Sequence, residues 1–177
     1  MANRVTFSGD HQAISDIALH HADLESALRN YFNSSGQSLA ARFVGYSSKD
    51  LKQELQNRLA EIELSSSLAI LAAIEASFRI DYLQRCQQKK KDAISRAFRE
   101  IFADKGFRTS LEDDILGVWA ERFDGSKTII GELRGALKFH HWLAHGRYWT
   151  PKLGRRYDFN DIYTIADAAL QHFDLIA

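Results

Sequence analysis

Basic and protonatable side chains recur on one face of a helix predicted for residues 126–145. The four of them, spaced at i, i+4, i+7 and i+11, are Arg134, Lys138, His141 and His145. A rotation of about 100° per residue places them in one stripe along the helix. Acidic side chains do not share that stripe, so we expect it to meet an anionic ligand.

Histidine combined with arginine suits the cleavage of RNA by its own 2′-hydroxyl group. A neutral imidazole can take the hydroxyl proton, and an imidazolium can protonate the leaving oxygen, because histidine titrates near neutral pH. A guanidinium can offset the charge that develops on the phosphate oxygens. Because RNA supplies the nucleophile, the protein needs only positioning and electrostatics, and we expect no cofactor.

Other reaction classes lack their sequence signals. The chain contains no G-x-G-x-x-G or G-x-x-x-x-G-K loop, no H-E-x-x-H and no G-x-S-x-G. His141 and His145 have the spacing of two zinc ligands on a helix, but no third ligand is evident, and the neighbouring Arg134 and Lys138 would repel a cation. The single Cys86 excludes an internal disulfide and a multi-cysteine zinc site. We therefore expect no metal site.

Two segments of the chain resemble the HEPN superfamily. They are the run FHHWLAHGRYW at residues 139–149 and the run SLAILAAIEASFRIDY at residues 67–82. The branch that they resemble most is the one called RiboL-PSP-HEPN, and the resemblance extends from Ser65 to the C-terminus. It implies a helical bundle that is commonly a homodimer. It also implies a metal-independent endoribonuclease of a toxin–antitoxin, phage-defence or RNA-processing system, with RNA and an antitoxin protein as partners.

The resemblance singles out the histidines of this stretch. His145 matches the catalytic histidine of the branch, and His141 matches a polar position that often assists it. The branch carries arginine where this chain has His140. Either protonated His140 substitutes, or Arg134 or Arg147 reaches in, or the domain is a weakened or inactive module that binds RNA, a nucleotide or a protein partner. His140 also falls on the apolar arc of the helix, so packing in the core or at a dimer seam is its structural alternative.

The remaining candidates surround these histidines. We expect Arg147, Arg134 and Lys138 to contact RNA phosphates. Glu75 and Arg79 interrupt the apolar surface of an earlier helix, where they either support the histidines or form an ordinary i, i+4 ion pair.

Hydrophobic periodicity predicts an all-α bundle of six to seven helices. The expected helices cover residues 10–32, 49–62, 65–82, 93–102, 110–123, 126–145 and 160–173. A helix start is predicted at residues 65–67, a left-handed end at Gly146, and N-caps at Ser47 or Ser48, Ser110, Ser126, and Asp158 or Asn160. A short extended piece is expected at residues 5–7 and a loop at residues 33–38, whereas residues 39–46 are ambiguous.

The composition fits one globular domain, residues 1–177, in which N-terminal helices (1–64) precede the HEPN-like part (65–177). The 177 residues are 45% hydrophobic and 26% charged, with a single proline, which favours long helices. The net charge is zero. Any polyanion site must therefore be a local patch.

A markedly basic segment covers residues 85–108, either as a solvated face or as a flank that contacts phosphates. The N-terminus lacks the apolar core of a signal peptide, and the most apolar run, residues 68–74, is too short to cross a bilayer. We therefore expect a cytoplasmic protein with no membrane contact.

Overall fold

A computed structural model describes residues 6–33 and 37–176, and these residues form an all-α protein without strands, as predicted. A 3₁₀ turn (Gly106–Arg108) and a π-helical turn (Leu111–Ile115) precede α5. The helices in chain order are α1 (Ile14–Asn33), α2 (Gln37–Arg42), α3 (Ser48–Gln88), α4 (Ala93–Lys105), α5 (Leu116–Arg122), α6 (Ser126–Ala144) and α7 (Phe159–His172). In the ranges that the structure describes, no helix is long and apolar enough to span a membrane.

The longest element, α3, is a single helix of 41 residues where two helices were predicted. Its N-cap is Ser47, whose hydroxyl accepts the N–H of Asp50 in a capping box. The predicted start at residues 65–67 is wrong, because those serines lie inside the helix and two of them are buried. Ser66 bonds His21 of α1 across 3.0 Å. The small side chains thus allow close packing of α1 on α3, while no Gly or Pro breaks the helix.

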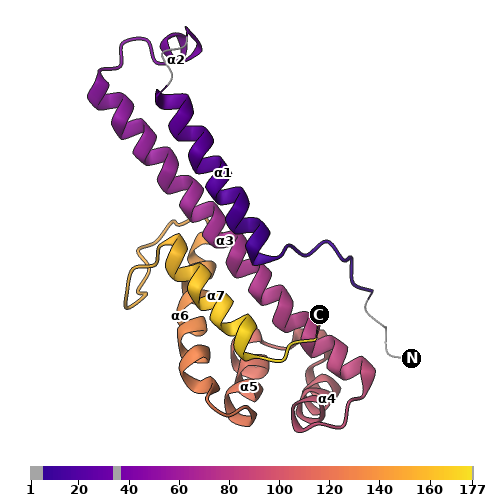
Figure 1. Ribbon diagram of the computed structural model, residues 1–177. Helices are drawn as coiled ribbons and strands as arrows, with labels where there is room; N and C mark the ends of the chain where they lie inside the picture. Colours follow the sequence, from indigo (N-terminus) through magenta and orange to yellow (C-terminus); the bar gives the residue numbers. More distant parts are fainter. Residues whose placement is uncertain (1–5, 34–36, 177) are drawn as a thin grey trace.

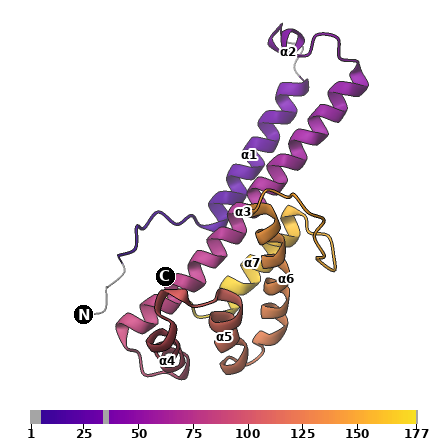
Figure 2. The same cartoon turned by 180° about the vertical axis from the view of Figure 1, so that it is seen from behind.

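The two halves of α3 have different surroundings (Figures 1 and 2). The first half pairs with α1 in a projecting hairpin that has α2 at its tip, and we call residues 18–33, α2 and residues 44–65 the arm. The second half lies along one side of α4, α5, α6 and α7, and with them it forms the body. The division at residues 64–65 predicted from the sequence therefore falls within one continuous helix.

The hydrophobic core lies in the body. Residues on the second half of α3 form one wall, as its continuous apolar surface predicted, and α5, α6 and α7 form the others. The fully buried side chains include Ile70, Leu71, Ile74, Phe78, Trp119, Ile130, Leu133 and Ile162.

A buried ion pair connects α3 to the C-terminal residues. The Arg85 Nε donates to Asp81 Oδ1 at 2.7 Å, and both side chains are almost completely buried. The backbone N–H of Ile176 donates to the same carboxylate oxygen at 2.9 Å, while the Arg85 guanidinium lies over the Trp119 ring. Burial raises the pKa of Asp81, and the hydrogen bonds from Ile176 and Arg85 oppose that rise. Arg85, counted in the basic surface segment from the sequence, is therefore an internal residue.

Some predicted details lie at the margins of the described residues. Val5 and residues 34–36 lie outside them, and Thr6 and Phe7 form no regular element. The ambiguous segment contains the end of α2 followed by a turn. Ser126 is the first residue of α6 and donates to the Trp119 carbonyl, so the prediction that it caps this helix is wrong.

Candidate functional site

The end of α6 positions His145. Gly146 has φ of +79°, and its N–H donates to the Leu143 carbonyl, while the Arg147 N–H donates to the Trp142 carbonyl. These two bonds form a Schellman motif, so His145 is the C-cap residue of α6. The predicted left-handed end at Gly146 is confirmed.

The buried face of α6 orients its polar side chains. Leu133, Ala136, Leu137 and Leu143 pack into the core. Lys138, His141 and His145 are consequently exposed, whereas His140 at the edge of the apolar face is partly buried.

A cleft of about 320 Å³ brings the three histidines to one place. The α3 residues Glu75 and Arg79 line it together with His140, His141 and His145. The π-helical turn contributes Leu111 and Glu112, and the residue before it, Ser110, also lines the cleft. Ser110 was predicted only as a helix cap, and neither it nor Glu112 was predicted to lie at the site, because their approach to α6 depends on tertiary packing.

Glu75, one of the two residues predicted to support the site, contacts both the other one, Arg79, and the nearest histidine, His140. Its Oε1 accepts a hydrogen bond from Arg79 Nε at 2.8 Å, and its Oε2 lies 3.6 Å from His140 Nδ1. The intrahelical ion pair raised as one alternative is therefore present, and it lies beside the histidine cluster, as the other alternative requires.

Burial sets the charge of His140. It lowers the pKa of the imidazole below its ordinary value of 6.5, an effect opposed by Glu75 and reinforced by the nearby His141 and His145. His140 is consequently neutral at neutral pH. This argues against the alternative in which a protonated His140 replaces the expected arginine.

His141 and His145 form an exposed pair whose ring centroids are 4.2 Å apart. His141 also lines a second hollow of about 380 Å³ with Lys138, Trp149 and Lys152. The segment that borders this hollow is held by a hydrogen bond from Trp142 Nε1 to the Trp149 carbonyl, at 2.7 Å. Two adjoining hollows thus meet at His141 and Glu112, and they provide room for a chain-like ligand.

Two of the predicted phosphate contacts point elsewhere. Arg147 binds Glu61 on the first half of α3 through two hydrogen bonds of 2.9 and 3.0 Å. This pairing raises the pKa of Arg147 and lowers that of Glu61. Arg134 donates to the Glu112 carbonyl at 2.8 Å. Of the three predicted phosphate ligands, Lys138 is the one that lines a hollow beside the histidines.

The basic segment at residues 85–108 surrounds the junction of α3 and α4. Arg96 and Arg99 donate to the carbonyls of Lys91 and Lys90 at that junction, each at 2.7 Å. Lys89, Lys90 and Lys91 are exposed. None of these basic residues lines either of the two hollows at the histidines.

Among the residues with described positions, no three His, Cys, Asp or Glu side chains are grouped to hold a metal ion. Comparisons of the chain with family models, curated proteins and solved structures find no match.

Proposed function

We propose that this protein is a metal-independent endoribonuclease of the HEPN type. The observation that carries the proposal is the partly buried His140, whose Nδ1 lies 3.6 Å from Glu75, in the same cleft as the exposed pair His141 and His145. A base that is neutral at working pH and a second histidine able to donate a proton are the two groups that RNA cleavage requires. The cleft is also open to a large substrate, because two of the three histidines are exposed.

The reaction uses the 2′-hydroxyl of RNA as its nucleophile. Because Nδ1 of His140 is the nitrogen nearest Glu75, Nε2 accepts the 2′-hydroxyl proton. The 2′-oxygen attacks the adjacent phosphorus, the bond to the 5′-oxygen breaks, and His145 protonates that leaving oxygen. The products are a 2′,3′-cyclic phosphate and a free 5′-hydroxyl. Arg79 in the cleft and Lys138 beside it offset the charge on the phosphate oxygens.

The second candidate is an inactive HEPN module that binds RNA or an antitoxin-like protein. The observation in its favour is that Arg147 and Arg134 already bind Glu61 and the Glu112 carbonyl. The biological setting that accompanies either candidate, a toxin or a phage-defence effector, belongs to the same proposal.

A cleavage assay under chelation separates the two candidates. The purified chain is incubated with end-labelled RNA, with and without excess EDTA, beside DNA of the same sequence. The nuclease is expected to cut the RNA equally in both buffers and to leave the DNA intact. Binding that weakens with salt, but without cleavage, would identify the module instead.

Replacing Glu75 by glutamine is expected to move the acidic limb of the pH–rate profile to lower pH. Glu75 raises the pKa of His140, so its removal lowers that pKa further and keeps the base neutral in more acidic solution. Glu54→Gln is the matched control, since Glu54 forms the same i, i+4 ion pair with Arg58 on the arm. An unshifted profile in the Glu75 variant would remove His140 from the role of base.

Replacing His140 by arginine restores the residue that the RiboL-PSP-HEPN branch carries at this position. It also tests whether His140 is the base, because it replaces the side chain itself rather than its neighbour Glu75. The variant is expected to lose about 100-fold or more in cleavage rate, because a guanidinium cannot accept the hydroxyl proton. His140→Gln should lose a similar amount, and thermal unfolding should establish that both variants are folded. A steep gain in the arginine variant would instead mean that position 140 serves as a cation.

A further inference from the structure

The second hollow at the histidines has the composition of a site for a flat, partly apolar group. Its volume of about 380 Å³ falls in the range of small-ligand pockets, roughly 300–1,000 Å³. Trp149, Pro151 and Leu153 supply apolar surface, and the other lining residues are polar or charged. The Trp149 ring is partly exposed and lies 5.9 Å from that of His141. Aromatic side chains in such places stack with the bases of single-stranded RNA.

The segment that carries Trp149 is held in place by its neighbours. The Trp149 carbonyl accepts the hydrogen of Trp142 Nε1 on α6 at 2.7 Å. Tyr148, which is 84% exposed, meets the Trp149 ring at an interplanar angle of 71°, with 4.6 Å between the ring centroids. Groups that are positioned before a ligand binds lose less entropy on binding. This segment is therefore suited to present an aromatic surface to RNA.

An acidic residue lies where the two hollows at the histidines meet. Glu112 lines both of them, and Arg134 fixes its backbone by donating to its carbonyl at 2.8 Å. The Glu112 carboxylate makes no hydrogen bond or ion pair with any residue that the structure describes. A carboxylate repels RNA phosphates, but it accepts hydrogen bonds from the N–H groups of bases. Its place at this junction therefore indicates recognition of a base rather than of the backbone.

We infer that the second hollow binds the base of a nucleotide that flanks the scissile phosphate, and that this base is guanine. Guanine is the base whose Watson–Crick edge carries two adjacent donors, a ring N–H and an amino group, and one carboxylate accepts both. Adenine and cytosine have an unprotonated ring nitrogen beside the amino group, and uracil has a carbonyl on each side of its N–H. Each of these three would turn a lone pair towards Glu112. The inference rests on the proposed function for the position of the scissile phosphate in the histidine cleft.

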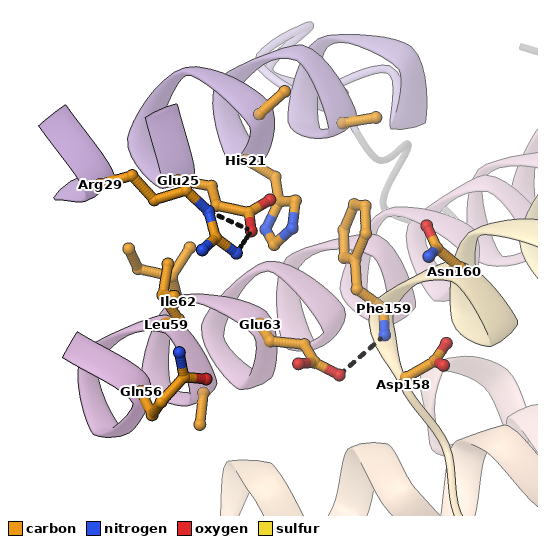
Figure 3. Close-up of a pocket in the computed structure, with 13 residues that line it drawn as sticks. His21, Glu25, Arg29, Gln56, Leu59, Ile62, Glu63, Asp158, Phe159 and Asn160 are labelled. Carbon is orange, nitrogen blue, oxygen red and sulfur yellow. Dashed lines mark hydrogen bonds and ion pairs between the residues drawn. The ribbon is translucent and has the colours of Figure 1, made fainter. Parts of the chain in front are cut away.

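A further hollow, at the base of the arm, differs in both features (Figure 3). Its volume is about 600 Å³, and α1, α3 and the start of α7 line it. Figure 3 shows His21 facing the Phe159 ring, with which it stacks at 3.9 Å, so these two rings already cover each other. Glu63 accepts the Phe159 N–H at 3.3 Å. Among the described residues, this hollow shares none with the two at the histidines, so Glu63 is a matched control for Glu112.

Binding of RNA that cannot be cut tests the inference without requiring catalysis. The probes are four fluorescent hexanucleotides with 2′-fluoro sugars, which lack the nucleophile, and they differ in one central base within a run of uridines. Fluorescence anisotropy is expected to show at least about 10-fold tighter binding of the guanine hexamer than of the other three, the effect of one bidentate base contact.

Glu112→Gln should abolish this preference, because an amide replaces one of the two acceptors by a donor. Its affinity for the all-uridine hexamer should be retained or slightly increased, since a negative charge is lost, and this retention shows that the variant is folded. Glu63→Gln removes the same charge and should keep the guanine preference.

Trp149→Ala is expected to weaken the binding of all four hexamers by about 5- to 150-fold, the usual effect of losing one base–aromatic stack. Trp149→Phe should retain most of the affinity, because it keeps an aromatic ring. Thermal unfolding establishes that both variants are folded.

Four results would overturn the inference. They are equal affinity for the four hexamers, a preference for another base, a guanine preference that survives Glu112→Gln, and no binding to any hexamer. The cleavage assay separates this inference from the proposed function. Cleavage without a guanine preference would support the nuclease and remove the guanine site, whereas a Glu112-dependent guanine preference without cleavage would support the guanine site and remove the nuclease.

Discussion

Replacing His145 by alanine is expected to lower the rate of RNA cleavage by about 100- to 10,000-fold, the usual contribution of a general acid. The imidazole is exposed at the C-cap of α6, where it can reach the leaving oxygen of a bound RNA. Its loss should leave the fold intact, because the Schellman bonds that end α6 use backbone atoms alone. The rate of cleavage of labelled RNA under chelation measures the effect.

The control for this substitution is His20→Ala, which removes an exposed histidine of α1 that lines neither hollow at the site. The rate of the control should equal that of the wild type. His141, with its ring 4.2 Å from that of His145, is the side chain most able to compensate. A His145 variant that retains full activity, in the His141→Ala background as well, would contradict the assignment of this pair.

Replacing Asp81 by alanine is expected to reduce the free energy of unfolding by about 3–5 kcal/mol, the cost of leaving one partner of a buried ion pair. Arg85 would keep its charge in an almost completely buried place with only Asp92 and the Asp174 carbonyl as partners, and the Ile176 N–H would lose its acceptor. Such a loss is a large fraction of the total stability of a small domain. Urea unfolding followed by circular dichroism measures it.

Two further variants show whether burial of the ion pair is the cause of this loss of stability. Glu54→Ala breaks a more exposed i, i+4 pair and should cost less than about 1 kcal/mol. Asp81→Leu combined with Arg85→Leu removes both charges and should be more stable than Asp81→Ala alone. If the double variant is instead the less stable one, the contacts of Arg85 with Asp92 and the Asp174 carbonyl stabilise the body by more than the buried charge costs.

Features of the fold and site that depend on local sequence were predictable. The exposed stripe on α6, its end at Gly146, and the caps at Ser47, Ser110 and Asp158 each require only neighbouring residues. The same local signal misled at residues 65–67. Ser66 and Ser67 are instead buried inside α3, and Ser66 bonds His21 of α1, a contact that the local pattern does not contain.

The features that could not be predicted depend on contacts between residues far apart in the sequence. The position of the Glu75–Arg79 pair beside His140 was anticipated because isolated charges on an apolar helix need partners. The pairing of Arg147 with Glu61 joins residues 86 positions apart, and the Arg134 bond ends on a backbone carbonyl. Helical periodicity predicts neither a backbone acceptor nor a distant carboxylate as a partner. Both arginines were therefore predicted to contact phosphate.

The ends of the RNA products test the central claim, that histidines of this chain drive attack by the RNA's own 2′-hydroxyl. Mass spectrometry is applied to products made under chelation, from RNA and from a matched RNA with a single 2′-deoxy nucleotide at the cleaved position. The expected result is a 2′,3′-cyclic phosphate and a 5′-hydroxyl from RNA, and no cut at the 2′-deoxy position. Cleavage at the 2′-deoxy position, or products with 5′-phosphate ends, would mean that water is the nucleophile and would contradict the proposed roles of His140 and His145.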